Sequence, residues 1–303
     1  VYAVVESFTL FNRWSPWADL DPATRYAFEG PERGVGAKMS WASDDPNVGK
    51  GSQTITAVTP DQQVVVALAF EGMPGATATL LLAPEGDGTR VTWRFDGDLP
   101  LALDGNFPFS VVGRYFGLAM DNFIGKDYDK GLGRLKVLLE GFPVADISGL
   151  EVLVHEVAAQ PAYVVSDLEA SVDSASSNAV MGAAYAQISA LAKANGIALA
   201  GPPCAVVRSH GNGKWRFDAG IGVERNDVPG SGRVSAAQTF AGKVAEFRHL
   251  GSYDTLEQTH AKASTWLATR GLVETAQRIE LYLNDAATTP VEQLETLLRV
   301  PVK

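Results

Sequence analysis

The strongest chemical signal in the sequence is an acidic residue, Glu280, inside a short apolar run. If residues 278–283 form a strand, alternation places Arg278, Glu280 and Tyr282 on one face and three aliphatic side chains on the other. Burying a carboxylate costs free energy unless it is paired or neutralised, and such groups concentrate where a ligand or a reaction uses them. Glu280 is therefore a candidate general base or counter-ion, with the Tyr282 hydroxyl as a donor beside it. The alternative is a solvated face on which Arg278 is the surface partner of Glu280 and Tyr282 is an ordinary core residue.

Aromatic residues elsewhere in the second half could complete such a site. Trp215 and Phe217 would share one face of a strand by the same alternation. They could form an aromatic wall for a ligand, or they could be core packing. His249 lies just before the run that ends in Tyr253, so we add His249 and Tyr253 to the candidate ligand contacts, and we take His249 as the histidine nearest the site.

The remaining reactive side chains show no metal or cofactor pattern. The histidines lack the spacing of zinc-binding helices, and the chain has one cysteine, Cys204. We interpret His155, His210 and His260 as surface or internally satisfied residues, and Cys204 as a small apolar side chain. No nucleophile elbow, phosphate loop or dinucleotide fingerprint follows a strand convincingly. We therefore predict no metal site and no cofactor.

A weak internal repeat predicts how the second half positions these residues. The helical segment that ends at Gly196 matches the one that ends at Gly271, 75 residues later, and glycine is a common signal for a helix end. The repeat aligns Glu280 with Ala205, so the scaffold itself does not require an acid there. We expect a pseudo-twofold α+β domain built from two βαββ units, with both helices on one side of a curved sheet and a ligand cleft between its halves. The predicted strands cover residues 151–157, 163–168, 204–209, 233–240, 243–249 and 279–283.

The first half is predicted to be β-rich with a long closing helix. Strands are expected over residues 2–10, 51–58, 62–70, 77–84 and 89–96, and residues 85–88 have the composition of a hairpin turn. The spacing becomes helical from residue 111 to 139. The candidate inward residues of this helix are Tyr115, Leu118, Phe123, Leu132, Leu135 and Leu139. The stretch 141–149, rich in Gly, Pro and Asp, is the predicted linker, which divides the chain into domains 1–142 and 143–303.

Composition bounds the function further. The chain has 303 residues, of which 46% are hydrophobic and 20% charged, with a formal net charge of -10. Both halves carry more acidic than basic residues, which argues against binding of nucleic acid or an anionic membrane surface. The longest apolar runs are strand-sized, and no signal peptide is visible. With a single cysteine, the sequence fits a cytoplasmic protein.

The second half resembles the GyrI-like (gyrase-inhibitor-like) effector-binding domains. The resemblance is carried by the segment from Gly196 to Pro203, by residues 215–220 and 249–254, and by residues 280–285 with a later Thr289-Pro290. It implies a cleft with a central acid and aromatic walls that binds lipophilic, often cationic, compounds. Some free-standing members are hydrolases that open cyclopropane-bearing natural products.

The first half resembles the START-like (SRPBCC, polyketide-cyclase-like) helix-grip superfamily. The carrying residues are the segment from Trp14 to Trp17, residues 34–37 and the run 114–136. The resemblance implies an antiparallel sheet wrapped around a long C-terminal helix, with an apolar cavity. Only about four residues separate the predicted first strand from Trp14, so we expect the family's two short helices to be missing.

Three functions are consistent with these patterns. The first is a small-molecule binding protein that holds a lipophilic, cationic or aromatic compound against Glu280, with Trp215, Phe217 and Tyr282 as apolar contacts. The second is a self-protecting hydrolase of strained electrophiles, in which Glu280 is the general base and Tyr282 binds the leaving oxygen. The third is a ligand-sensing module for transcription, although no DNA-binding helix is visible. A homodimer is left open.

Overall fold

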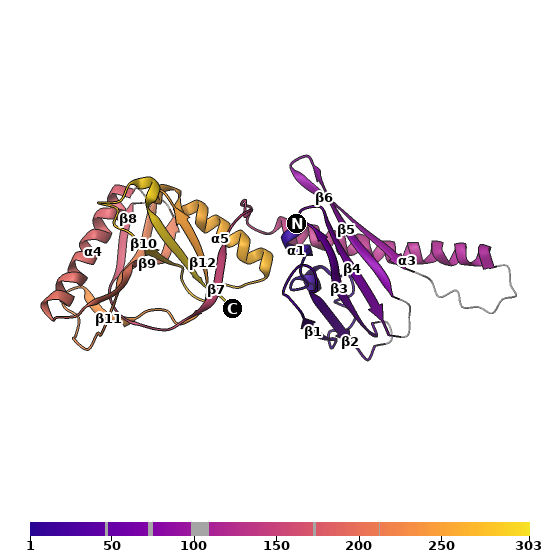
Figure 1. The fold of residues 1–303 in the computed structure, drawn as a ribbon, viewed down its shortest axis with the longest axis horizontal. Coiled ribbons are helices and arrows are strands. Elements are labelled where there is room, and N and C mark those ends of the chain that lie inside the picture. Colours follow the sequence, from indigo (N-terminus) through magenta and orange to yellow (C-terminus); the bar gives the residue numbers. More distant parts are fainter. Residues whose placement is uncertain (46–47, 72–74, 98–108, 172–173, 212) are drawn as a thin grey trace. The chain divides into compact units, whose positions relative to one another are not determined.

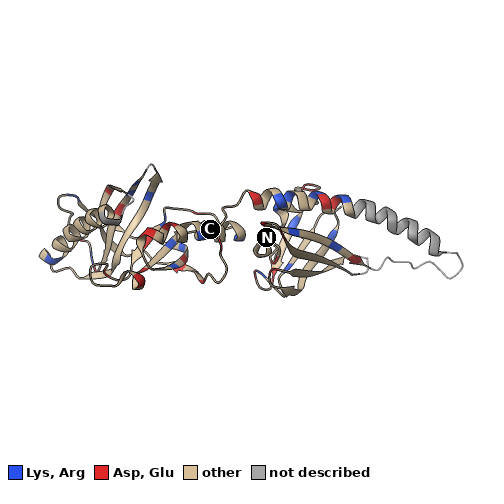
Figure 2. Cartoon of the chain, turned by 90° about the horizontal axis from the view of Figure 1, so that it is seen from above, with Lys and Arg blue, Asp and Glu red and all other residues tan. Residues whose placement is uncertain are grey.

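The computed structural model describes the chain except residues 46–47, 72–74, 98–108, 172–173 and 212, and except the side chains of residues 109–124 and 174–175. Two compact units emerge, one of Val1–Phe142 with Thr269–Gly271 and one of Pro143–Ala268 with Leu272–Lys303 (Figure 1). No helix in this described part is long and apolar enough to span a membrane. Lys and Arg are interspersed with Asp and Glu in both units (Figure 2).

The first unit is a single antiparallel sheet that wraps around a helix. Its six strands are hydrogen-bonded in chain order, and the last two form the predicted hairpin, in which Glu85 pairs with Gly88 and Gly86 has a φ of 58°. Ile55, Val64 and Leu80 point from the sheet into a core that Leu135 of the long helix completes. The elements are α1 (Tyr2–Val5), α2 (Phe11–Trp14), β1 (Arg25–Glu29), β2 (Lys38–Ala42), β3 (Lys50–Thr59), β4 (Gln63–Phe70), β5 (Ala76–Glu85), β6 (Gly88–Gly97) and α3 (Phe109–Glu140).

The start of the chain differs from the prediction in two ways. Residues 2–10 contain helix α1 rather than a strand, and a second helix, α2, follows, so the expectation of a missing helix pair is wrong. The reason is visible in the burial. Val4, Val5 and Phe8 are all buried, a spacing that fits one side of a helical turn and not the alternation of a strand.

The long helix α3 agrees with its prediction within the described residues. It runs from Phe109 to Glu140 without interruption, although three glycines lie in its second half. Leu132, Leu135 and Leu139 pack into the core of the unit, as expected. The side chains of the other three predicted inward residues, Tyr115, Leu118 and Phe123, lie outside the described residues.

The second unit has the predicted pseudo-twofold architecture. Its eight-stranded antiparallel sheet has the order β11-β8-β10-β9-β13-β14-β12-β7. The triplet β8-β10-β9 and the triplet β12-β14-β13 are arranged symmetrically about the β9–β13 boundary, and the first strand of each repeat pairs with the other repeat. The elements are β7 (Val152–Val157), β8 (Pro161–Ser171), α4 (Ser174–Ala194), β9 (Leu199–Gly211), β10 (Lys214–Val223), β11 (Val234–Gln238), β12 (Gly242–Leu250), η1 (Tyr253–Thr255), α5 (Leu256–Arg270), β13 (Ile279–Tyr282), η2 (Val291–Gln293) and β14 (Glu295–Pro301).

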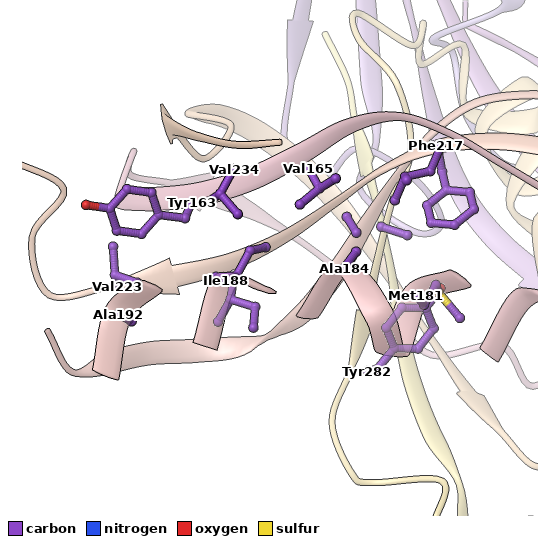
Figure 3. Close-up of a cluster of buried hydrophobic side chains, with 14 of the residues drawn as sticks. Tyr163, Val165, Met181, Ala184, Ile188, Ala192, Phe217, Val223, Val234 and Tyr282 are labelled. Atoms are coloured by element: carbon purple, nitrogen blue, oxygen red, sulfur yellow. The ribbon is translucent and has the colours of Figure 1, made fainter. Parts of the chain in front are cut away.

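Both helices of this unit cover the same face of the sheet, as the repeat predicts. Helix α4 shares a buried cluster with Ala205 and Phe217 (Figure 3), and α5 shares one with Leu298. Glu280 is the register partner of both Ala205 and Leu298, and directly paired residues point to the same side. Glu280 therefore lies on the helix-covered face, at the boundary between the two repeats.

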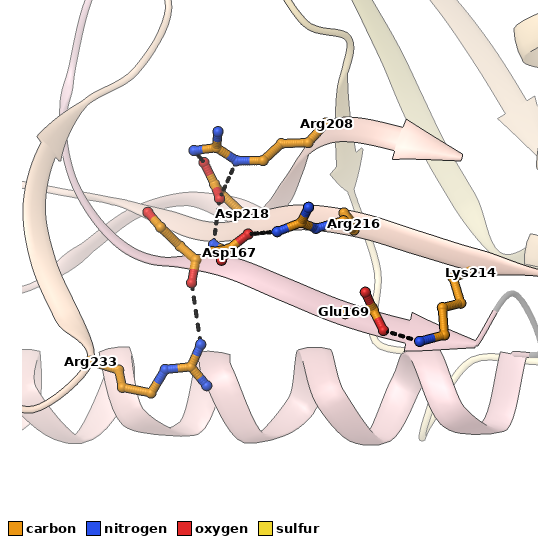
Figure 4. A network of polar contacts seen from close by, with 8 residues as sticks. Asp167, Glu169, Arg208, Lys214, Arg216, Asp218 and Arg233 are labelled. Atoms are coloured by element: carbon orange, nitrogen blue, oxygen red, sulfur yellow. Dashed lines mark hydrogen bonds and ion pairs between the residues drawn. The ribbon is translucent and has the colours of Figure 1, made fainter. Parts of the chain in front are cut away.

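The opposite face of the first repeat is a ladder of ion pairs open to solvent. Arg216 pairs with Asp167, Arg208 with Asp218, and a lysine on β10 with a glutamate on β8 (Figure 4). Exposed pairs of this kind contribute little to stability, because water screens them. The two faces of one sheet thus hold charge in opposite environments.

Candidate functional site

The predicted burial of Glu280 is confirmed. Its exposed fraction is 3%, and it lies on β13, whose opposite face carries Ile279 and Leu281. Tyr282, two residues on, shares the face of Glu280 and belongs to the cluster that contains Phe217 and Met181 (Figure 3). Strand alternation alone brings the acid and the phenol together, as the sequence indicates.

Each carboxylate oxygen of Glu280 has its own protein partner. The Tyr282 hydroxyl donates to Oε2 at 2.6 Å, and Nε2 of His260 lies 2.8 Å from Oε1. Burial, and next the negative charge of Glu280, raises the pKa of Tyr282 well above its ordinary value. The phenol therefore stays protonated and remains a donor at neutral pH.

Arg278 is not the partner of Glu280, contrary to the alternative considered from the sequence. Its guanidinium pairs with Glu274 at 2.5 Å and donates to Ser264 and to the backbone carbonyl of His260. Its Nη1 also lies 3.3 Å from Nδ1 of His260. Arg278, His260, Glu280 and Tyr282 therefore form one connected chain of polar contacts.

His260, which we interpreted from the sequence as a surface or internally satisfied residue, is thus the histidine that contacts the acid, and the prediction that His249 is the histidine nearest the site is wrong. The two ring nitrogens of His249 face Thr259 and the carbonyl of Ser252, so this residue holds a loop to α5. One signal for His260 existed. Under the repeat it aligns with Tyr185, and Tyr185 also lies close enough for the charge of Glu280 to raise its pKa, after the larger effects of burial and Cys204.

Aromatic rings surround this chain on the helix-covered face. Trp215 and Phe217 stack with centroids 3.9 Å apart, and Tyr253 meets Tyr282 edge-on at 5.4 Å. His210 lies between the Trp215–Phe217 pair and the chain of polar contacts, because its ring centroid is 5.7 Å from that of Trp215 and 6.2 Å from that of His260. Burial lowers the pKa of His210, an effect that Glu280 partly opposes. Phe217 is fully buried, so it is a core residue that packs against the ring of Trp215.

Two side observations bear on chemistry. Burial raises the pKa of the Cys204 thiol to about 11, which fits the interpretation of an unreactive residue. No cluster of three or more His, Cys, Asp or Glu suited to a metal ion is present among the described residues.

Two family models match the chain, one in each half. Residues 160–303 match the family described as the GyrI-like small molecule binding domain. The second half of the chain is a GyrI-like domain. Residues 1–140 match the family described as polyketide cyclase / dehydrase and lipid transport, so the first half is a polyketide-cyclase-like domain of the SRPBCC type. The chain thus combines a small-molecule binding domain with a helix-grip domain.

Solved structures resemble parts of the chain at low identity. The C-terminal domain of EcmrR is 16% identical, with 51% of this chain and 98% of that one covered and a TM-score of 0.45. EcmrR in a DNA complex is 17% identical, with coverage of 67% and 75% and a TM-score of 0.46. A hydrolase from Listeria innocua is 16% identical, with coverage of 50% and 92% and a TM-score of 0.39. No curated protein matches the chain.

The polyketide-cyclase-like domain holds an apolar cavity of about 200 Å³. Helices α1 and α2, which the sequence did not predict, supply Val5, Phe11 and Trp14 to its wall, and the segment between the two helices supplies Phe8. The remaining wall includes Trp41, Trp93 and Tyr128, and the last two rings stack at 3.8 Å. Trp14 Nε1 is buried and has no acceptor among the described residues.

Proposed function

We propose that the GyrI-like domain binds a lipophilic organic cation, with Glu280 as its counter-ion. The observation that carries the proposal is the environment of the Glu280 carboxylate. It is buried, its partners are a phenol and an imidazole, and among the described residues it has no ion pair with Lys or Arg. Because charges attract strongly where water is excluded, such a carboxylate favours a bound cation.

Aromatic contacts support the same ligand class. A cation over the face of an aromatic ring gains ~0.5–2 kcal/mol per contact. Trp215, Tyr253 and Tyr282 belong to the aromatic rings around the polar chain of Glu280 and could make such contacts. Trp215 Nε1 is buried without an acceptor among the described residues, so it offers a donor to an oxygen or nitrogen of the ligand. The ligand would approach the site past His260 and Tyr253, because these two side chains are only partly buried.

Titration with tetraphenylphosphonium, whose charge does not depend on pH, tests the proposal. Glu280→Gln keeps the shape of the side chain and removes its charge, so affinity should fall about 10- to 100-fold, the scale of one charge-assisted contact. Glu246→Gln is the matched control. Glu246 is also a buried acid on this sheet, but it pairs with Arg299 at 2.6 Å. Equal affinities of the wild type and Glu280→Gln would contradict the proposal.

Binding is favoured over hydrolysis by the contacts of Tyr282. A hydrolase would use this hydroxyl on the leaving oxygen of the substrate, yet here it donates to Glu280. The two functions separate experimentally. Incubation with cyclopropane-bearing aromatic electrophiles, followed by mass spectrometry, should show no gain of water. A mass gain that Glu280→Gln abolishes would establish the hydrolase instead.

We also propose a second, uncharged ligand in the cavity of the polyketide-cyclase-like domain. The unpartnered Trp14 indole N–H favours a small aromatic compound that carries a hydrogen-bond acceptor, because an unsatisfied buried donor costs ~1–3 kcal/mol. Acetophenone and ethylbenzene have similar size, and only the former carries a carbonyl. Acetophenone should bind more tightly to the wild type, and Trp14→Phe should remove the difference. The same preference in Trp14→Phe would contradict the assignment of the donor.

A further inference from the structure

The contacts of Arg278 assign the proton on His260. An arginine has only N–H donors, so where Nη1 of Arg278 meets Nδ1 of His260 the ring nitrogen must accept. A neutral imidazole with a lone pair on Nδ1 carries its proton on Nε2. That proton points at Oε1 of Glu280, 2.8 Å away. The geometry therefore describes a neutral histidine that donates to an ionised carboxylate.

Arg278 is well suited to hold this arrangement. Its side chain is 15% exposed, and it also donates to both carboxylate oxygens of Glu274, to the Ser264 hydroxyl and to the carbonyl of His260. A second proton on His260 would have to sit on Nδ1, directly against the guanidinium, where two positive charges repel. Glu280 acts in the opposite direction, since an adjacent carboxylate favours the imidazolium. His210 on β9 is a further ionisable group near the ring, with ring centroids 6.2 Å apart, and Glu257, one turn earlier on α5, acts on His210.

The charge of the cluster follows from this assignment. Arg278 and Glu274 cancel each other, and His260 and Tyr282 are neutral donors. Glu280 alone then carries the net negative charge, fixed in place by two hydrogen bonds and not neutralised by either.

We infer that His260 is a positioning residue for Glu280. Arg278 occupies Nδ1 of His260 and so prevents His260 from taking a second proton and becoming the counter-ion of Glu280. The site therefore stays selective for cationic ligands. This inference rests on the proposed function of the same site. It makes a prediction opposite to the one expected from the charge of Arg278 alone, since loss of a positive charge would ordinarily strengthen the binding of a cation. Removing the positive charge of Arg278 should weaken the binding of a cation, because His260 then gains a proton and neutralises Glu280.

The experiment compares the wild type with the double variant Arg278→Gln, Glu274→Gln, in which the net charge of the pair is unchanged. Tetraphenylphosphonium affinity is measured from pH 6 to pH 9. We expect the double variant to bind about tenfold more weakly at pH 7 than at pH 9, where His260 loses the added proton, and the wild type to vary less over this range. Adding His260→Gln, which keeps a neutral donor, should remove the pH dependence. Arg278→Lys keeps a donor at the same place and should rescue part of the affinity at pH 7.

Nitrogen NMR of the histidine-labelled protein provides a readout that does not require a ligand. In the wild type at pH 7, the ring of His260, assigned by comparison with His260→Gln, should show an unprotonated Nδ1 and a protonated Nε2. In the Arg278 double variant both nitrogens should be protonated. A wild-type ring with both nitrogens protonated, or a double variant that binds the cation more tightly at every pH, would overturn the inference.

The failures of the two proposals can be told apart. If the wild type binds no cation at all, the proposed function fails and the claim about ligand charge fails with it, while the nitrogen spectrum still supports or overturns the tautomer. If the wild type binds and only the pH profiles disagree, the role of Arg278 fails and the cation site stands. Circular dichroism and thermal unfolding identify any variant that does not fold, and the nitrogen spectrum of the wild type then still supports or overturns the tautomer.

Discussion

In the GyrI-like domain, β13 carries Glu280 and Tyr282 where its repeat partner β9 carries Ala205 and Val207. The supporting helices differ in the same way, because His260 of α5 corresponds to Tyr185 of α4. Tyr185 donates to the backbone carbonyl of Cys204, whereas His260 faces Glu280. Two copies of one scaffold thus hold an apolar centre and a charged one. The comparison teaches that the same scaffold position accepts an alanine in one repeat and an acid in the other, so the scaffold itself does not require the acid.

Making the apolar repeat resemble the charged one should have the largest effect. Ala205 is fully buried and lies directly opposite Glu280. Ala205→Glu would place a second carboxylate beside the first without a partner, so we expect the free energy of unfolding to fall by about 3–5 kcal/mol at pH 7. Urea denaturation measures this loss, and Ala205→Gln controls for added volume. The difference between the two variants should shrink as the pH falls toward 4, because protonation removes the new charge.

Removing the tyrosine hydroxyl from each repeat should show that a hydrogen bond to a carboxylate contributes more to stability than one to a neutral carbonyl. Tyr282→Phe deprives a buried carboxylate of a donor and should cost about 1.5–3 kcal/mol, whereas Tyr185→Phe removes a bond to a carbonyl and should cost about 0.5–1.5 kcal/mol. Chemical denaturation of both variants gives the comparison. Only Tyr282→Phe should also change tetraphenylphosphonium affinity. Equal effects of the two variants on both measurements would remove the distinction between the repeats.

Alkaline pH should weaken the charged repeat through its phenol. The pKa of Tyr282 is raised in the folded state by burial and by Glu280, above the value of 10.0 expected for the unfolded chain. Its contribution to stability is therefore complete below pH 10 and is lost as the pH rises further, by about 1.4 kcal/mol per pH unit for one proton. Burial raises the pKa of Tyr185 too, so Tyr185 also contributes to the loss of stability at alkaline pH. Unfolding followed from pH 9 to pH 11 should show a slope that Tyr282→Phe reduces by one proton.

The smallest effect is expected on the outer face of the sheet. Arg208 is about half exposed, and its partner Asp218 is 14% exposed (Figure 4). Arg208→Gln should cost less than about 1 kcal/mol, and the cost should decrease in high salt. Arg299→Gln is the comparison, because Arg299 pairs with the buried Glu246 and its loss leaves that acid without an arginine. Thermal unfolding at two salt concentrations checks both. A large, salt-independent loss from Arg208→Gln would show that the outer pairs are structural.

Much of this molecule is readable from local patterns. Alternation predicts that Glu280 and Tyr282 share a face, and the repeat predicts two helices that end at Gly196 and Gly271, where φ is 62° and 69°. The strands of the second half that we predicted are present, as are β3 to β6 of the first. Helices α1 and α2 were misread, because a short apolar run of four or five residues satisfies both a strand and a buried helical turn. Strands β1, β2 and β14 were not predicted.

The sequence by itself therefore determined that Glu280 and Tyr282 share one face, because this follows from the period of a single strand. The two families followed from the resemblance of longer segments in each half. Only the tertiary structure decided which side chains complete the site. His260 lies 20 residues before Glu280 and on a helix, and the distance between them depends on how α5 packs across the sheet. Arg278 shares the strand face of Glu280 by alternation, yet it turns to Glu274 and to His260. Contacts between a helix and a strand depend on packing that no local period encodes, so the proton assignment on His260 could not be read before the fold was known.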